Sequence, residues 1–238
     1  MKPRIKIQGL SIFISIIITI FLHTMLFPRW EGRLWNDLFN FLGILLVLFG
    51  FLFRVSARGH KEERSSQGRS LVNDGPYALV RNPMYFGTLL IGTGAIAILF
   101  QFWTIFLFLA VFLLIYIPQV RKEEALLAVM FKDEYREYSK AVPGYFPRIR
   151  FLLNPRKYLD LKLSWIKKEL SSFIFTLAII FAIEIWEDVL LGRDELIKKP
   201  LELVFVILLL VIFWVLFRAR KPEVFPSVDE KVSSFRIK

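Results

Sequence analysis

The sequence predicts an all-α, polytopic membrane protein with about six transmembrane helices. Of the 238 residues, 55% are hydrophobic and 16% aromatic, which is more apolar surface than a soluble domain of this length can bury. The charged residues, 22% of the chain, are concentrated between long apolar runs. These runs are close to or longer than the roughly 20 residues that a helix needs to cross a bilayer.

The first two apolar runs lie before a basic region. Ile7–Pro28 has no formal charge, is too long for a signal peptide and lacks a small-residue cleavage site, so we interpret it as a retained first span. Leu34–Val55 is the second span, with Asp37 near one end.

Asn82–Val120 is free of formal charge and too long for one crossing, so the sequence predicts two helices joined by a tight hairpin near Gln101–Trp103. Ser171–Leu191 and Leu201–Phe217 are the fifth and sixth spans. The fifth span carries three acidic residues, Glu184, Glu187 and Asp188. They either line a polar path or mark a fraying helix end near the far interface, and we favour the fraying end.

The basic residues predict the orientation. An even number of crossings places both termini and both basic loops on one side, which the positive-inside rule makes the cytoplasmic side. The net charge is 32 − 21 = +11, and beside such apolar runs it favours anionic lipid headgroups, and not nucleic acid, as the partner. The polar tail, Pro222–Lys238, is expected to pack poorly. The basic residues of the second loop are Arg54, Arg58, Lys61, Arg64 and Arg69.

The composition also excludes several chemistries. The chain has no Cys, which excludes a disulfide framework, thiolate metal ligands and a Cys nucleophile. Its two His residues, His23 and His60, are isolated, so no metal site is predicted.

The segment Gly75–Gly87 is the most informative part of the chain. Asn82–Pro83 predicts a helix start, with Asn as the N-cap and Pro at the first helical position. A helix N-terminus offers free backbone N–H groups and a positive dipole end to an anion, and Arg81 lies beside it.

Simpler explanations stay open for this segment. Tyr77, Arg81 and Tyr85 are residue types that favour the headgroup region, so the segment is equally consistent with an interfacial anchor. Gly87, Gly92 and Gly94 favour close helix packing over ligand binding.

A pair of carboxylates follows the second arm of the hairpin. Glu123 and Glu124 stand just beyond the apolar span, where carboxylates are costly unless they face a polar cavity or a partner. The hairpin brings the start of one arm and the end of the other to the same membrane face, so Arg81 can meet this pair. A solvated charge cluster is the alternative. The prolines of Val142–Pro147 predict a stiff connector after the helix.

These motifs together resemble the isoprenylcysteine carboxyl methyltransferase and phospholipid methyltransferase superfamily. The resemblance covers roughly residues 70–150 and adds Phe131, Glu134-Tyr135 and Tyr138 to the segments above. It implies an integral-membrane enzyme that uses S-adenosylmethionine, releases S-adenosylhomocysteine and binds the cofactor at the cytoplasmic face. The implied catalytic residues are Arg81, Glu123 and Glu124; the implied cofactor-binding residues are Tyr77, Arg81, Asn82, Pro83, Tyr85, Gly87, Glu123, Glu124 and Tyr135.

The resemblance also suggests an organisation of the chain. We expect two N-terminal spans and a basic loop in 1–69, the methyltransferase core in 70–150, an amphipathic connector and two further spans in 151–221, and the tail in 222–238. The last two spans lie outside the recognised core. One departure concerns the substrate: the isoprenylcysteine enzymes have Arg-His-Pro where this chain has Arg81-Asn82-Pro83, whereas Asn82–Tyr85 is similar to the phospholipid N-methyltransferase pattern.

The residues suit methyl transfer from this donor. Glu123 or Glu124 can bind its ammonium, and Arg81 or the helix N-terminus its carboxylate. The expected acceptor is a lipophilic molecule that enters from the bilayer, with a phospholipid amine slightly favoured over an isoprenylcysteine carboxylate. The other functions kept open are isoprenylcysteine carboxyl O-methylation, a membrane NADPH-dependent reductase and a non-catalytic lipid-binding scaffold.

Overall fold

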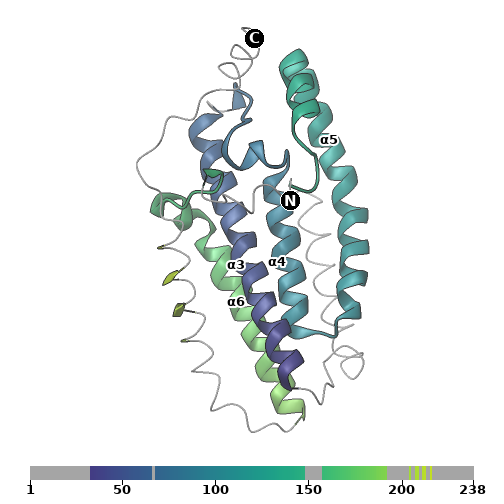
Figure 1. Ribbon diagram of the computed structural model, residues 1–238, viewed down its shortest axis with the longest axis vertical. Coiled ribbons are helices and arrows are strands. Elements are labelled where there is room, and N and C mark those ends of the chain that lie inside the picture. The colour runs from purple at the N-terminus through teal and green to yellow at the C-terminus, as the bar shows by residue number, and fades with distance from the viewer. Residues whose placement is uncertain are drawn as a thin grey trace, which may run out of the picture.

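The computed structural model describes residues 33–65, 68–147 and 157–191, together with six positions within 204–215. Every regular element in this part of the chain is helical, as expected (Figure 1). The elements are α3 (Arg33–Arg64), the short 3₁₀ helix η2 (Gly75–Ala78), α4 (Pro83–Leu99), α5 (Trp103–Ala141) and α6 (Leu163–Leu191).

Three of these helices are long and apolar enough to cross a membrane: Leu38–Arg64, Trp103–Ala141 and Leu163–Glu187. The chain is therefore a multi-pass membrane protein. Helix α4 is apolar and has 17 residues, a length of about 25 Å at 1.5 Å per residue. The expected first span, most of Leu201–Phe217, the tail and both termini lie outside the described residues.

The helical hairpin is confirmed. Helix α4 ends at Leu99 and α5 begins at Trp103, so the turn lies within one residue of its predicted place. Thr104 closes the turn, because both its backbone N–H and its hydroxyl donate to the carbonyl oxygen of Gln101, at 3.0 and 2.6 Å.

The predicted end of the second span and the predicted start of the fifth are wrong. Helix α3 continues past Val55 to Arg64, so four of the five basic residues assigned to the second loop are helical. Helix α6 begins at Leu163, before Ser171, and continues to Leu191. The expected fraying end is absent from this stretch, where Glu187 is buried.

Charge pairing explains both extensions. The carboxylate of Glu169, which is 1% exposed, accepts hydrogen bonds from Nε and Nη2 of Arg54 at 3.1 and 3.0 Å and from Arg58. Arg54 also donates through Nη1 to Thr88 of α4, at 2.8 Å. A buried carboxylate is costly unless it is paired, so α3 and α6 must both remain helical across this region to keep the pairing.

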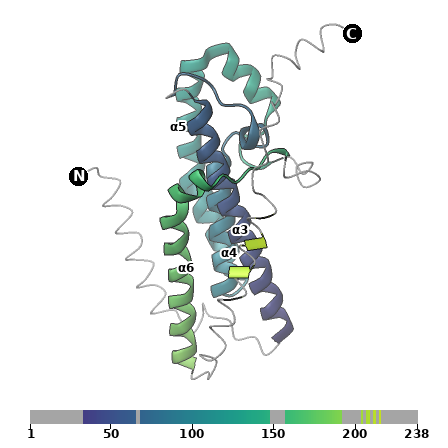
Figure 2. The same cartoon turned by 90° about the vertical axis from the view of Figure 1, so that its left-hand side faces the viewer.

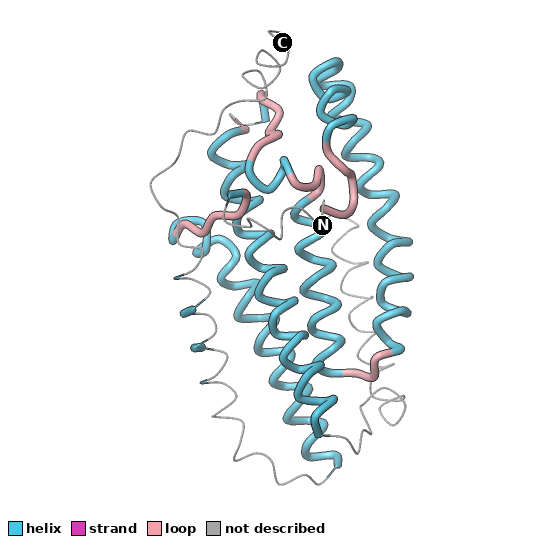
Figure 3. The backbone as a smooth tube through the Cα atoms, viewed as in Figure 1, coloured by secondary structure: helices cyan, strands magenta, loops and turns pink. Residues whose placement is uncertain are grey.

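Backbone contact fixes the spacing of α3 and α4, which run side by side (Figures 1 and 3). A Cβ at Gly50 would lie 2.6 Å from the carbonyl oxygen of Gly87, and one at Gly87 would lie 2.6 Å from that of Gly50. Gly43 and Gly94 make the same reciprocal contact, at 2.8 and 2.5 Å. The packing role expected for Gly87 and Gly94 is therefore confirmed.

Helix α5 continues beyond the hairpin, and its direction changes at Lys132 (φ 42°, ψ −115°). The segment from Lys132 to Ala141 then turns back, as the arch at the top of Figure 2 shows. This return brings Tyr138 to the start of the hairpin, where its hydroxyl donates to the carbonyl oxygen of Tyr77 at 2.8 Å.

We predict that Gly50→Ala destabilises the protein. The added methyl group must push α3 and α4 apart, and overpacking of this kind costs about 1–3 kcal/mol. Helix propensity alone would stabilise Ala over Gly by about 1 kcal/mol, so the sign of the change separates the two effects. Thermal unfolding in detergent measures it. An equal or higher melting temperature would contradict the close approach.

Candidate functional site

The loop before α4 is braced against α3. Asp74 accepts from Nε2 of His60 at 2.7 Å and pairs with Arg64 at 3.2 Å. Burial of Asp74 opposes its ionisation, but the hydrogen bond from His60 and the neighbouring Arg64 guanidinium outweigh burial and hold its pKa below the usual value. Gly75 adopts φ +53°, and a Cβ there would lie 2.8 Å from the His60 ring, so only glycine fits. The brace fixes where the chain enters α4.

Asn82 holds the N-cap position of α4, as predicted, but its side chain does not cap the helix. The amide Nδ2 donates to Oε1 of Glu124 at 3.0 Å and to the carbonyl oxygen of Gly144 at 3.0 Å. Asn82 therefore links α4 to α5 and to residues 142–147, which we call the cap segment. The backbone N–H of Arg81 also donates to this segment, at the Pro143 carbonyl oxygen 2.9 Å away.

The expected meeting of Arg81 with the carboxylate pair is confirmed. Nε of Arg81 lies 3.3 Å from Oε1 of Glu124, and the two side chains are 17% and 18% exposed. This nitrogen is not aligned for a hydrogen bond, and within the described residues the buried hydroxyl of Tyr135 has no hydrogen-bond partner either. Two buried polar groups beside Glu124 thus retain capacity to bind a polar ligand.

The second carboxylate is held by two donors. Glu123 accepts through Oε1 from the hydroxyl of Tyr85 at 2.5 Å and from Nε2 of Gln119 at 2.8 Å. Burial raises the pKa of the Tyr77 phenol and the negative charge of Glu123 raises it further, so this phenol stays neutral over the physiological range. Glu123 and Glu124 therefore face different partners: neutral donors for the first, and Arg81 and Asn82 for the second.

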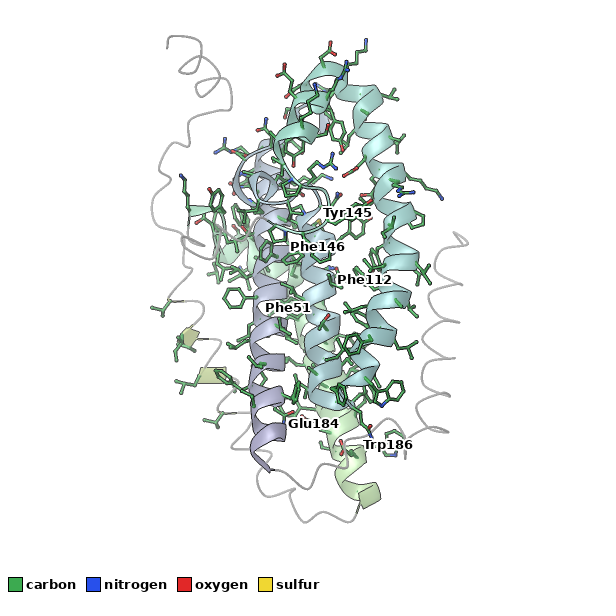
Figure 4. All side chains as sticks on the ribbon, turned by 45° about the vertical axis from the view of Figure 1, so that its right-hand side comes forward. Phe51, Phe112, Tyr145, Phe146, Glu184 and Trp186 are labelled. Carbon is green, nitrogen blue, oxygen red and sulfur yellow. The ribbon has the colours of Figure 1, made fainter. Side chains whose placement is uncertain are left out.

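Aromatic rings form the wall beside these carboxylates. The rings of Phe112 and Tyr116 stack at 4.0 Å, and Tyr85 meets Tyr116 edge-on at 5.1 Å. Tyr145 and Phe146 of the cap segment lie above Phe112 in Figure 4 and line the same cleft between α4 and α5. The enclosed volume is about 30 Å³, room for about one water molecule, whereas ligand pockets usually measure about 300–1,000 Å³. The cap segment therefore closes the cleft in this conformation.

Most of the residues that the resemblance implied lie together. Arg81 and Asn82 contact Glu124, Tyr85 contacts Glu123, and Pro83 starts α4 next to Asn82. Gly87 does not join them, because the space at its Cβ position is filled by Gly50 and Arg54 of α3, on another side of α4.

Some residues of the cleft were not anticipated as site residues. Phe112, Tyr116 and Gln119 lie on the cleft side of α5 with Glu123, as ring contacts, lining positions and a hydrogen bond show. Their spacing was the available signal, because positions four, seven and eleven residues before Glu123 share one helical face.

These side chains suit a ligand that carries an amino-acid group and an aromatic group, as S-adenosylmethionine does. Glu123 and Glu124 can accept from an ammonium, Arg81 can pair with a carboxylate, and the rings can pack on an adenine. Opening of the cap segment is needed to make room. The described residues contain no cluster of three or more metal-ligating side chains.

We predict that Asn82→Ala loosens the cap segment. The change removes the donor to Gly144, and a lost hydrogen bond costs about 1 kcal/mol, so exchange of the amide hydrogens in 142–147 should quicken by about fivefold. Hydrogen-exchange mass spectrometry measures it. Ser139→Ala is the matched control, because the Ser139 hydroxyl donates only to Arg136 in its own helix. Unchanged exchange in Asn82→Ala would show that Arg81 and Pro143 alone hold the segment.

Comparisons with known proteins find several similar chains. The chain is 34% identical over 138 residues to the cobalt-zinc-cadmium resistance protein CzcN of Cupriavidus metallidurans, a match covering 56% of this chain and 62% of that protein. It is 38% identical over 79 residues to protein-S-isoprenylcysteine O-methyltransferase of Schizosaccharomyces pombe, covering 33% of this chain and 34% of the enzyme. The chain thus spans less than two thirds of either relative.

A third relative is the nickel-cobalt-cadmium resistance protein NccN of Alcaligenes xylosoxydans xylosoxydans, 27% identical over 66% of this chain and 71% of that protein. No solved structure matches the chain. Residues 38–134 match the family described as phospholipid methyltransferase, and this stretch contains Arg81, Asn82 and both carboxylates. Over residues 38–134, the chain is therefore similar to the phospholipid methyltransferase family.

Proposed function

We propose that this protein transfers a methyl group from S-adenosylmethionine to a lipophilic acceptor at the cytoplasmic face of the membrane. The supporting observation is the convergence of Arg81, Asn82, Glu123 and Glu124 beneath the cap segment, at the open end of the α4–α5 hairpin. The similarity of residues 38–134 to the phospholipid methyltransferase family supports the reaction class.

Each side chain of the cleft has a role in this proposal. S-adenosylmethionine, when bound, supplies the methyl group from its sulfonium. Glu124 accepts a hydrogen bond from an ammonium, while Arg81 turns toward a carboxylate. Tyr85 and Gln119 fix the orientation of the Glu123 carboxylate, which then accepts a proton from an amine acceptor. The aromatic walls exclude water, and in-line methyl displacement depends mainly on alignment of the reactants.

The acceptor we favour is a phospholipid amine. Helix α4 is about 25 Å long, so a cleft at its start lies near one surface of the hydrocarbon core, at the depth of a lipid headgroup. Asn82 stands where the isoprenylcysteine enzymes have a histidine. This difference favours an amine acceptor over a prenylated carboxylate. Titration with S-adenosylmethionine and with NADPH separates this proposal from a reductase, which binds only NADPH, and from a scaffold, which binds neither.

Replacing Glu124 by Gln should weaken binding of S-adenosylmethionine by about 1.5–3 kcal/mol, the worth of a hydrogen bond to a charged group. Calorimetry on the purified protein in detergent measures this. Glu137→Gln is the matched control, because Glu137 is exposed on the same helix. If both variants bind as the unchanged protein does, Glu124 is not a cofactor ligand.

The pH dependence of transfer distinguishes the two acceptor classes. Methylation of an amine should rise with pH as the acceptor loses its proton, whereas methylation of a carboxylate should be flat above about pH 5, since a carboxyl group has a reference pKa near 3.5. Phosphatidylethanolamine and a prenylcysteine analogue are offered in the same detergent with labelled donor. Transfer to the prenylcysteine analogue alone would overturn the preference for an amine.

Two relatives named as metal-resistance proteins favour a second candidate, a role in tolerance of divalent metals. Growth on cadmium of a host lacking the gene, complemented with the unchanged protein or with Glu124→Gln, tests it. Rescue by the unchanged protein alone would make methyl transfer the basis of tolerance. Rescue by both would make tolerance independent of the cleft, and rescue by neither would remove the second candidate.

A further inference from the structure

A second cavity lies between α3 and α6. Its volume is about 480 Å³, within the range of ligand pockets, and apart from Glu169 its lining is apolar. We call it the α3–α6 groove. The residues that define it include Leu48, Phe51 and Val55 of α3 and Ile166, Leu170 and Phe173 of α6.

The groove is separate from the candidate methyl-transfer cleft. Helix α4 packs against α3 on one side and α5 on another (Figure 1). The cleft is lined by α4, α5 and the cap segment, whereas the groove is lined by α3, α6 and the residue Leu161 before α6. Figure 4 shows Phe51 of the groove on α3, apart from Phe112 and Tyr145 of the cleft. The groove is therefore a separate candidate site.

The groove's lining residues on α3 and α6 belong to helices that are long and apolar enough to cross a membrane, where lipid hydrocarbon is at hand. The described side chains of 204–215 do not fill it, since they are 45–62% exposed. An aliphatic chain matches this volume and lining.

One end of the groove is cationic. Glu169 lies between Arg54 and Arg58, so two guanidiniums face one carboxylate and one positive charge is left over. Arg58 is 48% exposed there.

Lys167 adds a further positive charge on α6, outside the lining itself. It follows the lining residue Leu163 by four positions and precedes Leu170 by three, so it shares their side of α6. It forms no ion pair with a described residue, whereas its neighbours Lys162 and Lys168 pair with acidic residues of α3.

We propose that the α3–α6 groove binds an anionic phospholipid, with one acyl chain in the groove and the phosphate at Arg58 and Lys167. An anionic headgroup neutralises the surplus positive charge, and the acyl chain replaces contacts that the apolar lining would otherwise lack. This lipid is bound between α3 and α6, apart from the cleft, so it is distinct from the methyl acceptor. It joins α3 of the family-matched region to α6, which lies outside it.

The absence of Cys from the chain allows a direct test. A single thiol is introduced either in the groove, as Leu170→Cys, or on α5, as Leu114→Cys. Leu114 is 75% exposed. Leu163→Cys, at a second and more exposed lining position, serves if the first variant does not fold. The full chain in detergent reacts with an uncharged maleimide, alone or with phosphatidylglycerol, phosphatidylcholine or inorganic phosphate.

We expect phosphatidylglycerol to slow labelling of the thiol in the groove but not of the thiol on α5. Phosphatidylcholine should slow labelling in the groove less, and inorganic phosphate should not slow it. Adding Lys167→Gln should raise the phosphatidylglycerol concentration needed for half protection by about fivefold, the worth of one basic residue near an anionic lipid. Lys140→Gln, at an exposed position of α5, is the control and should leave it unchanged.

Three results would overturn the proposal. A groove thiol shielded before lipid is added, and unaffected by lipid, would mean that another segment of the chain or a second copy fills the groove. Equal protection by both phospholipids, unchanged by Lys167→Gln, would mean that the groove does not recognise an anionic headgroup. Protection by inorganic phosphate alone would assign the site to a free anion.

Discussion

The close approach of α3 and α4 is the constraint on which the rest of the structure depends. Two reciprocal glycine contacts, Gly43 with Gly94 and Gly50 with Gly87, bring the two backbones together without intervening side chains. At this separation Arg54 reaches both Thr88 of α4 and Glu169 of α6. A wider α3–α4 pair would separate these partners, so the glycines position the buried charge cluster as well as the helices.

The same pair sets the start of α4, where the candidate site lies. His60 and Arg64 at the end of α3 hold Asp74, which directs the chain into Arg81 and Asn82. The hairpin then returns α5 so that Glu123 and Glu124 meet this segment. Because Asn82 donates both to Glu124 and to Gly144, the carboxylate and the cap segment share one side chain. Asn82 therefore ties the position of the cap segment to that of the Glu124 carboxylate.

The boundaries of the family match divide the molecule in an informative way. Residues 38–134 include most of α3, all of α4 and the two carboxylates, while the cap segment and α6 come later in the chain. The cleft therefore combines polar groups from the family region with a closing segment from outside it. The charge cluster does the same, since Arg54 and Arg58 belong to the matched region and Glu169 does not.

The sequence by itself determined the helical class, the hairpin turn near Gln101 and the encounter of Arg81 with the carboxylate pair, because apolar runs and turn residues are local signals and a hairpin has few geometries. Only the tertiary structure decided the length of α3, the pairing of Glu169, the contact of Gly87 with Gly50 and the use of the Asn82 amide. These depend on which faces of separate helices meet. Apolar runs establish that a helix forms but leave its rotation open, and in a membrane that rotation is set by small-residue contacts and buried polar pairs between segments far apart in the chain.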